Sequence, residues 1–280
     1  MARIKNIEFY NFRNFKSFKT LFDSKLNILF GDNGCGKTNI LEGISLIAKG
    51  RGIRNSNISN LIKKNEYNFL IKNNLEIQKN DFNIEIFTEK KNDKFKKVIK
   101  INNDSTKDSL NFLNQSISYL IFLPEMERLF QASPSYRRNF LDRLVFSCKN
   151  NYNILINKYK KSLLERNKIL QSYNIDNDWL NRIEIEICSL GLEIYKIRNS
   201  QLNILNIELN KMKSDHNFPF DVKLEIKDNF VNNEINYEEF LSNLKNSRVY
   251  DKQFGGTKIG PHKSDVISIV NKEYEASLLS

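Results

Sequence analysis

Cysteine and histidine are scarce in this chain of 280 residues, which holds three cysteines and two histidines. Cys35, Cys148 and Cys188 are an odd number without the spacing of a zinc site. The histidines, His216 and His262, form no ligand cluster in the sequence. We therefore expect reduced thiols and no structural metal.

Long apolar segments are also missing. No run of about 18 apolar residues occurs, which is the length that a membrane-spanning helix needs. The N-terminus carries Arg3 and Lys5 and then mixed polarity, without the apolar stretch of a signal peptide. These features predict a cytoplasmic globular protein with no membrane partner, long enough for one large domain or two modest ones.

Positive charge is in excess, with 44 lysines and arginines against 33 acidic residues and a formal net charge of +11. Such a balance favours a polyanionic partner such as nucleic acid. Lysine, asparagine and isoleucine are abundant throughout the chain, so a general compositional bias also explains part of the excess.

The most informative motif is GDNGCGKT, which fits the nucleotide-binding pattern G-x-x-x-x-G-K-[ST]. It follows an apolar run, Leu26–Phe30, that predicts a strand, and it precedes a predicted helix over Asn39–Lys49. The glycines let backbone N–H groups point at phosphates, while Lys37 supplies charge and Thr38 offers a hydroxyl to Mg²⁺. The predicted ligand is a nucleoside triphosphate with Mg²⁺, and its predicted binding residues are Gly31, Asp32, Asn33, Gly34, Cys35, Gly36, Lys37 and Thr38.

The rest of the chain mixes strands with a long helical region. Residues 3–12 predict a strand with Ile7 and Phe9 on one face. The predicted hairpins join Phe82–Thr88 to Phe95–Ile101 and, after a strand over Val222–Ile226, Val266–Val270 to Tyr274–Leu278. Residues 135–215 are predicted to be mostly helical, and a break in the apolar heptads after residue 197 favours a compact helical arm over a long coiled coil.

A short apolar run, Ser118–Leu123, is the place to test for a Walker B strand. Such a strand ends in an Asp that holds the Mg²⁺ water, but Pro124 stands at that position. We therefore interpret the run as a strand of the core or of an interface.

Several further segments occur in a fixed order with the phosphate-binding loop. They are NFRNF at 11–15, GRGIR at 50–54, FLPE at 122–125, RRNFLDRL at 137–144, LLERNKIL at 163–170 and GGTKIGPHKSD at 255–265. Over the whole chain they resemble the RecF family of bacterial recombination-repair proteins, in the SMC-type branch of ABC ATPases.

The resemblance implies an α/β fold, a P-loop NTPase of the SMC/ABC-type ATPase head with a mainly α-helical second lobe. On that pattern residues 1–110 and 216–280 form the head lobe and residues 111–215 form the helical lobe. Lys37 and Thr38 bind the phosphates and Mg²⁺, and Arg13 and Asn14 lie near the nucleotide.

The resemblance also implies a role in DNA replication and repair. An intact relative is expected to dimerise around ATP, bind double-stranded and gapped DNA, and work with RecR and RecO in RecA loading and the SOS response. DNA backbone contacts need positive charge and reach, so we expect them from Arg51, Arg54, Arg137, Arg138, Lys158, Lys160 and Lys161. In the GPHKSD segment, His262 is interpreted as structural rather than as a general base.

The sequence departs from the family at its end. Ser280 stands where the signature motif is expected to begin, and the Walker B strand is expected further on. We therefore expect a chain that lacks the C-terminal part of the head, has lost appreciable ATP hydrolysis, and leaves Leu26–Phe30 exposed at a sheet edge.

Two alternatives remain at this point. A P-loop GTPase or small-molecule kinase is one, although the strings at 157–160 and 271–274 lack the Asp of the guanine motif N-K-x-D. The other is a hydrolysis-deficient module that binds DNA or RecR whether or not nucleotide is present.

Overall fold

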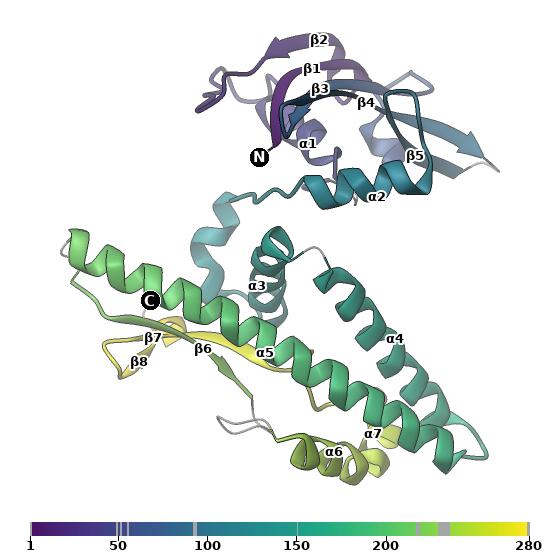
Figure 1. Cartoon of the computed structure of the whole chain (residues 1–280), viewed down its shortest axis with the longest axis vertical. Coiled ribbons are helices and arrows are strands. Elements are labelled where there is room, and N and C mark those ends of the chain that lie inside the picture. The colour runs from purple at the N-terminus through teal and green to yellow at the C-terminus, as the bar shows by residue number, and fades with distance from the viewer. Residues whose placement is uncertain are drawn as a thin grey trace. The chain divides into compact units, whose positions relative to one another are not determined.

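The computed structural model describes residues 2–48, 50, 52–54, 56–91, 94–149, 151–216, 219–228 and 236–278 (Figure 1). Its contacts divide the chain into two units, Met1–Ile121 and Phe122–Ser280. These boundaries differ from the expected ones, because the strands after residue 216 form a sheet of their own beside the helices of the second unit. The contacts do not test the expected division by function, so a head lobe made of 1–110 and 216–280 stays a prediction.

The first unit is built on an antiparallel sheet of five strands in the order β2-β1-β3-β4-β5. The strands are β1 (Ala2–Phe12), β2 (Phe15–Leu21), β3 (Leu70–Ile77), β4 (Asn80–Lys91) and β5 (Lys94–Ile101). The helical segments are α1 (Lys37–Ser45), the 3₁₀ turn η1 (Ile58–Leu61) and α2 (Lys107–Ser116). The predicted first strand and the first hairpin are present, whereas β2 was not predicted.

One face of this sheet packs on α1. Ile7 and Phe9 alternate with more exposed residues along β1 and are fully buried, as their spacing predicts. A Cβ at Gly43 would lie 2.2 Å from a ring carbon of Phe9, so only glycine lets α1 approach the sheet this closely. The position of α1 matters because this helix follows the phosphate-binding loop directly.

The C-terminal end of α1 is held by Lys97 on β5. The Lys97 ammonium donates hydrogen bonds to the carbonyl oxygens of Leu46, Ala48 and Gly50 at 2.8–3.1 Å. A cation suits the negative end of the helix dipole, and it satisfies carbonyls that have no partner inside the helix. Burial of this ammonium lowers the pKa of Lys97 to about 8.

Two predicted strands of this region are not formed. Leu26–Phe30 has no strand pairing, and Leu26, Ile28 and Phe30 are exposed. The expected exposure of this run is therefore found without the expected strand, because no described strand supplies backbone partners to it. Ser118–Leu123 is likewise irregular and mostly exposed, so the prediction of a core strand there is wrong.

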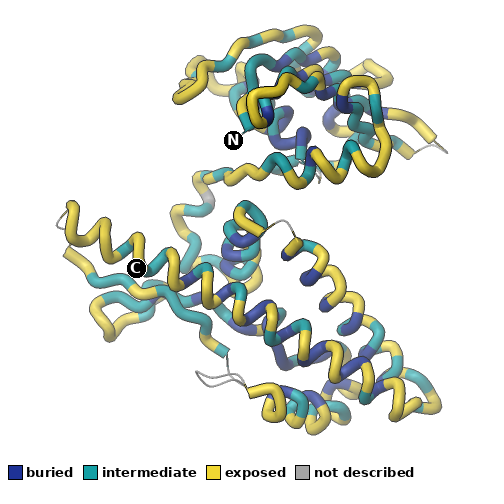
Figure 2. The backbone as a smooth tube through the Cα atoms, in the orientation of Figure 1, coloured by how far each residue is buried: buried dark blue, intermediate teal, exposed yellow. Residues whose placement is uncertain are grey.

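The second unit contains packed helices, and its residues 135–215 are mostly helical, as predicted. After the 3₁₀ segment η2 (Pro124–Gln131), the helices are α3 (Pro134–Cys148), α4 (Tyr152–Gln171), α5 (Asn177–His216), α6 (Tyr237–Asn246) and α7 (Arg248–Phe254). Dark, buried positions recur along α5 in Figure 2 and form a stripe, and the buried residues of this helix include Leu180, Ile187 and Ile194. This stripe confirms the predicted apolar spacing, and it packs against α4.

A small antiparallel sheet lies against α5 in the same unit (Figure 1). Its strands are β6 (Val222–Lys227), β7 (Asp265–Val270) and β8 (Tyr274–Glu275), followed by the 3₁₀ turn η3 (Ala276–Leu278). Asn271 and Lys272 both have positive φ, at 52° and 63°, which is typical of a tight hairpin turn. The predicted closing hairpin is present with a shorter second strand.

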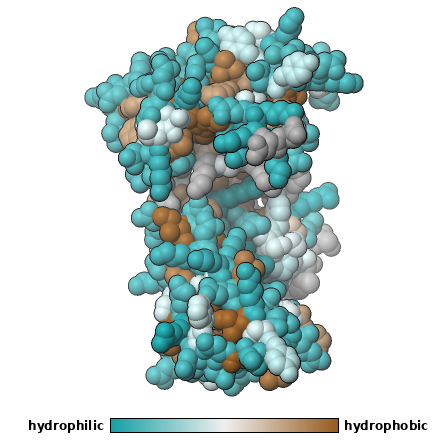
Figure 3. Space-filling model, turned by 90° about the vertical axis from the view of Figure 1, so that its right-hand side faces the viewer, coloured by the Kyte–Doolittle hydropathy of each residue, from teal (hydrophilic) through white to brown (hydrophobic). Residues whose placement is uncertain are grey.

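Figure 3 shows small, separated hydrophobic patches on a largely hydrophilic face. Within the described residues, no helix has the length and apolar character that crossing a membrane requires.

Candidate functional site

The loop Gly31–Thr38 has the backbone that a phosphate cradle requires. Gly31, Gly34 and Gly36 take positive φ values of 141°, 87° and 111°, a region that side chains rarely adopt. A Cβ at Gly36 would also lie 2.5 Å from the Phe15 ring and 3.0 Å from the Asn14 amide. The glycines are therefore needed for the turn, and Gly36 is also needed for close packing against the chain that follows β1.

Helix α1 begins at Lys37 and leaves its first amides available. Gly36 is the N-cap, it offers no side-chain cap, and the first helical hydrogen bond runs from the Ile40 amide to the Gly36 carbonyl. The amides of Lys37, Thr38 and Asn39 precede that bond, so the helix supplies no acceptor for them. Together with the positive end of the helix dipole, they form a site suited to an anion.

The Lys37 side chain lies across the same loop. Its ammonium donates to the carbonyl oxygens of Gly31 at 2.6 Å and Asp32 at 2.9 Å, and lies 3.8 Å from the Cys35 sulfur. Thr38 is exposed beside it at the start of the helix. These residues fit a phosphate chain with Mg²⁺, because the Lys37 ammonium and the exposed Thr38 hydroxyl belong to the same loop as the available amides.

Asn14 links the turn after β1 to the loop. Its amide nitrogen donates to the Cys35 carbonyl at 3.3 Å, and its amide oxygen accepts from the Asn39 side chain at 2.8 Å. The structure thus brings Asn14 next to the phosphate cradle, where the sequence placed it, and a direct nucleotide contact stays a prediction.

Arg13 makes a different set of contacts. Its guanidinium forms two hydrogen bonds of 2.8 Å with the Glu42 carboxylate and further bonds with the Ser56 hydroxyl and the Asn60 carbonyl. Arg13 therefore fixes α1 to η1 and to the segment before it, and its predicted place beside the nucleotide remains untested.

Glu42 is a central residue of the site that sequence reasoning missed. It is fully buried on α1, and its carboxylate also accepts from Arg54 at 3.4 Å. The Arg54 guanidinium in turn donates to the side chain of Asn39 at 3.0 Å. Position 42 lies off the apolar stripe of the predicted helix, so no periodicity pointed to it.

The basic residues predicted to contact DNA differ in whether their charged groups are already bound to other groups of the protein. Arg51 lies outside the described residues. Arg137 is 8 % exposed, and its guanidinium is bound to the Asp265 carboxylate at 2.6 and 2.8 Å and to two carbonyls. Lys158, Lys160 and Lys161 are exposed on α4.

His262 occupies a partly buried structural position in the GPHKSD segment. Nε2 donates to the Thr257 carbonyl at 2.8 Å, and Nδ1 lies 2.8 Å from the Tyr159 hydroxyl, from which it accepts when the ring is neutral. Burial, with further repulsion from Lys263, lowers the pKa of His262 to about 4. Both ring nitrogens are thus engaged with protein groups, and neither is free for a general-base role.

This burial predicts a pH-dependent stability. The pKa of His262 is about 6.5 in the unfolded chain and about 4 in the folded chain. Between these pH values the unfolded chain binds a proton that the folded chain does not, so acidification favours unfolding. We expect the free energy of unfolding to fall by about 2 kcal/mol from pH 7 to pH 5, measured by urea denaturation. In His262→Asn this dependence should largely disappear, whereas His216→Asn should keep it; an equal pH dependence in both variants would contradict the assignment.

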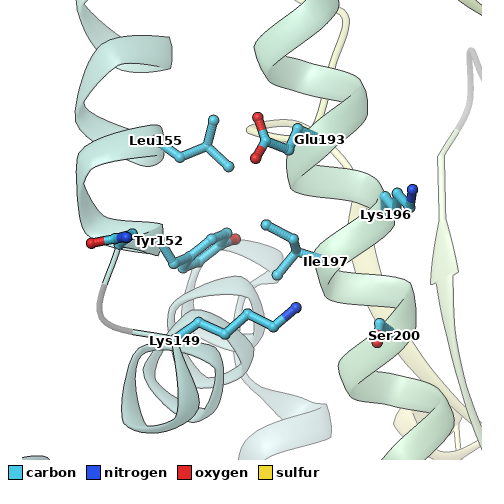
Figure 4. Close-up of a pocket in the computed structure, with 8 residues that line it drawn as sticks. Lys149, Tyr152, Leu155, Glu193, Lys196, Ile197 and Ser200 are labelled. Carbon is cyan, nitrogen blue, oxygen red and sulfur yellow. The ribbon is translucent and has the colours of Figure 1, made fainter.

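Two cavities lie in the unit Phe122–Ser280. The larger, of about 460 Å³, lies between α4 and α5, and Figure 4 shows Tyr152, Leu155 and Ile197 pointing into it. Lys149, Lys196 and Glu193 supply charges of both signs at its edge. The smaller, of about 180 Å³, lies next to His262.

The comparisons with known proteins identify the family. The "RecF/RecN/SMC N terminal domain" model matches residues 3–131. The "DNA replication and repair protein RecF" of Rickettsia massiliae (strain Mtu5) is 32% identical over 268 residues, covering 94% of this chain and 73% of the relative. The chain belongs to the RecF family.

Solved structures of RecF agree with this membership over nearly the whole chain. One, described as the recombination mediator protein RecF-ATPrS in the RecFOR pathway, has a TM-score of 0.83 and 29% identity, and covers 99% of this chain and 76% of that one. The corresponding RecF-ATP structure has a TM-score of 0.84 and 26% identity, with 100% and 76% coverage. The fold is that of the RecF/SMC ATPase head, a P-loop NTPase with a helical second lobe, and membership gives no support to a GTPase or a small-molecule kinase.

Proposed function

We propose that this RecF-family chain binds ATP with Mg²⁺ at Gly31–Thr38, and that the bound nucleotide controls its hold on double-stranded and gapped DNA. The observation that carries the proposal is the amide cradle at the start of α1, with Lys37 and Thr38 at its mouth. The RecF structures described as ATP and ATPrS complexes support the choice of ATP.

The proposed mechanism uses binding energy rather than product-forming chemistry. The loop amides and Lys37 bind the phosphates, Thr38 contacts Mg²⁺, and Asn14 holds the loop from the side of the sheet. A ligand that binds one conformation or association state better than another shifts the equilibrium toward it. On this proposal ATP favours a DNA-bound dimer in the cytoplasm, working with RecR and RecO to assist RecA loading.

The first test replaces Lys37 by alanine. Losing a charge-assisted contact to phosphate is expected to weaken ATP binding about 10–100-fold and to remove ATP-dependent retention on DNA. Binding of a fluorescent ATP analogue and DNA retention with and without ATP·Mg²⁺ measure the two effects. Lys16→Ala, at an exposed lysine on β2, is the charge-matched control and should behave as the parent chain.

DNA retention that stays the same in Lys37→Ala would favour the second candidate, a module that binds DNA or RecR regardless of nucleotide.

DNA contacts are proposed for each unit separately, from Arg54 in the first unit and from Arg138, Lys158, Lys160 and Lys161 in the second. Arg137 is left out because its guanidinium is engaged with Asp265. The three lysines are exposed on α4, where a phosphate backbone can reach them without a change in the protein.

Replacing Lys158 and Lys161 by glutamine tests this interface through its salt dependence. Each lost phosphate contact lowers the slope of log K against log salt by about 0.9 on duplex DNA. We expect the double variant to flatten the slope by about 1.8, measured by fluorescence anisotropy between low and moderate salt. Lys90→Gln with Lys96→Gln, in the other unit, gives the same change in net charge; an equal loss of slope there would indicate non-specific attraction.

A further inference from the structure

The smaller cavity of the second unit has an unusual balance of charge. It lies between α3, α4, α5 and the loop of Pro261 and His262, and has a volume of about 180 Å³. The charged residues in its wall are Arg138, Asp142, Lys160 and Arg198. Three of these four are basic, and His262 beside them is held neutral.

The acid of this wall is already neutralised. Both oxygens of Asp142 accept from Arg198 at 2.9 Å, and one of them also accepts from the Tyr152 hydroxyl at 2.7 Å. Arg198 is 3 % exposed and also donates to the Pro261 carbonyl. This rigid, paired unit leaves the charges of Arg138 and Lys160 uncompensated, a formal excess of +2 at the cavity.

Arg138 has guanidinium N–H groups that make no hydrogen bond to the described residues. One nitrogen of its half-buried guanidinium donates to the Ser264 carbonyl at 2.5 Å, and it forms no ion pair within the described part of the chain. Asp142 and Asp265, the acids that act on it through their charge, are bound by Arg198 and Arg137. Burial, followed by repulsion from Arg198, lowers the pKa of Arg138, as for a cation held without a partner.

We propose that this cavity binds a phosphate group, with Arg138 as its main ligand and Lys160 as a second positive charge from α4. A guanidinium offers parallel N–H donors that match a tetrahedral oxyanion, and an ammonium adds a mobile charge. The Asn139 amide, also in the wall, adds a neutral donor. The site belongs to a different unit from the phosphate-binding loop, so the proposal does not depend on nucleotide binding at Lys37.

The test measures binding of radiolabelled inorganic phosphate by equilibrium dialysis. Every chain carries Lys37→Ala, which removes the main competing charge at the loop. The parent chain is expected to bind one phosphate, and Arg138→Gln should weaken it about tenfold. The matched control is Lys168→Gln, at an exposed lysine of α4 outside the cavity wall, and it should leave the affinity unchanged.

Absence of phosphate binding in the parent, or equal binding in Arg138→Gln, would overturn the proposal. If Arg138→Gln does not fold, two other variants replace it. Arg138→Lys keeps the positive charge at position 138, and Lys160→Gln removes the positive charge of the exposed lysine. Lys160→Gln is expected to lower the affinity about threefold or more, and an unchanged value would equally overturn the site.

Competition by DNA then identifies the source of the phosphate. Duplexes with 5′-phosphate and with 5′-hydroxyl ends are added to the dialysis at equal concentration. Competition by the phosphorylated duplex alone assigns a strand end, competition by both assigns the backbone, and competition by neither assigns free phosphate. Each of these outcomes supports the cavity as a phosphate site.

Discussion

Replacing Arg166 by methionine is expected to lower the free energy of unfolding by about 3–5 kcal/mol. Arg166 lies on α4, is fully buried, and bonds to the carboxylates of Glu184 at 3.0 Å and Asp251 at 2.7 Å. Its other contacts are the Thr257 hydroxyl, the Leu244 carbonyl and the Ser247 hydroxyl. One side chain thus ties α4 to α5, α6, α7 and the loop before the GPHKSD segment.

The size of this effect follows from what remains after the substitution. Methionine replaces the packing of the arginine stem, but Asp251 is left buried without its cation. Glu184 keeps a second partner, because Arg248 binds the same carboxylate at 2.6 Å. The main penalty should therefore arise at Asp251.

Urea denaturation of three variants separates these contributions. Arg248→Met, at a side chain that is 24 % exposed, should cost clearly less than Arg166→Met. Adding Asp251→Asn to Arg166→Met should recover part of the loss, because it removes the unpaired charge. A loss below about 1 kcal/mol for Arg166→Met would show that the ion pairs contribute little beyond packing.

Replacing Glu42 by glutamine is the second large effect that we expect, with a loss of about 2–4 kcal/mol in the free energy of unfolding. The carboxylate is fully buried, whereas its partner Arg13 keeps some access to water, which places the cost below that of Arg166. The substitution removes the charge that holds Arg13 through two hydrogen bonds of 2.8 Å.

The same substitution should also act on the proposed nucleotide site. Glu42 fixes α1 to the turn after β1, and the amides of the phosphate cradle are the first amides of α1. We expect ATP affinity to fall about tenfold in Glu42→Gln, measured at a temperature where the variant is folded. Arg54→Gln, which removes the more exposed partner, should cost under about 1 kcal/mol; equal stability of Glu42→Gln and the parent would contradict the role of Glu42.

The sequence by itself determined the features that depend on neighbouring residues. The glycine and lysine spacing of residues 31–38 specified the turn and the helix start of the proposed phosphate cradle, since both are local. The apolar spacing along α5 and the turn at Asn271 and Lys272 were likewise readable, because a helix face and a tight turn need only a few residues. The order of its motifs was enough to suggest the RecF family.

Only the tertiary structure decided the features that join distant residues. Arg137 and Asp265 are 128 positions apart, and Arg13 and Glu42 are 29 apart, so no local pattern shows that either pair exists. The same dependence on distant residues explains why Leu26–Phe30 is not a strand. Its composition favours a strand, but a strand also needs a neighbouring strand that pairs with its backbone groups. Ion pairs and strand pairing depend on the packing of the whole chain, so only the tertiary structure could identify them.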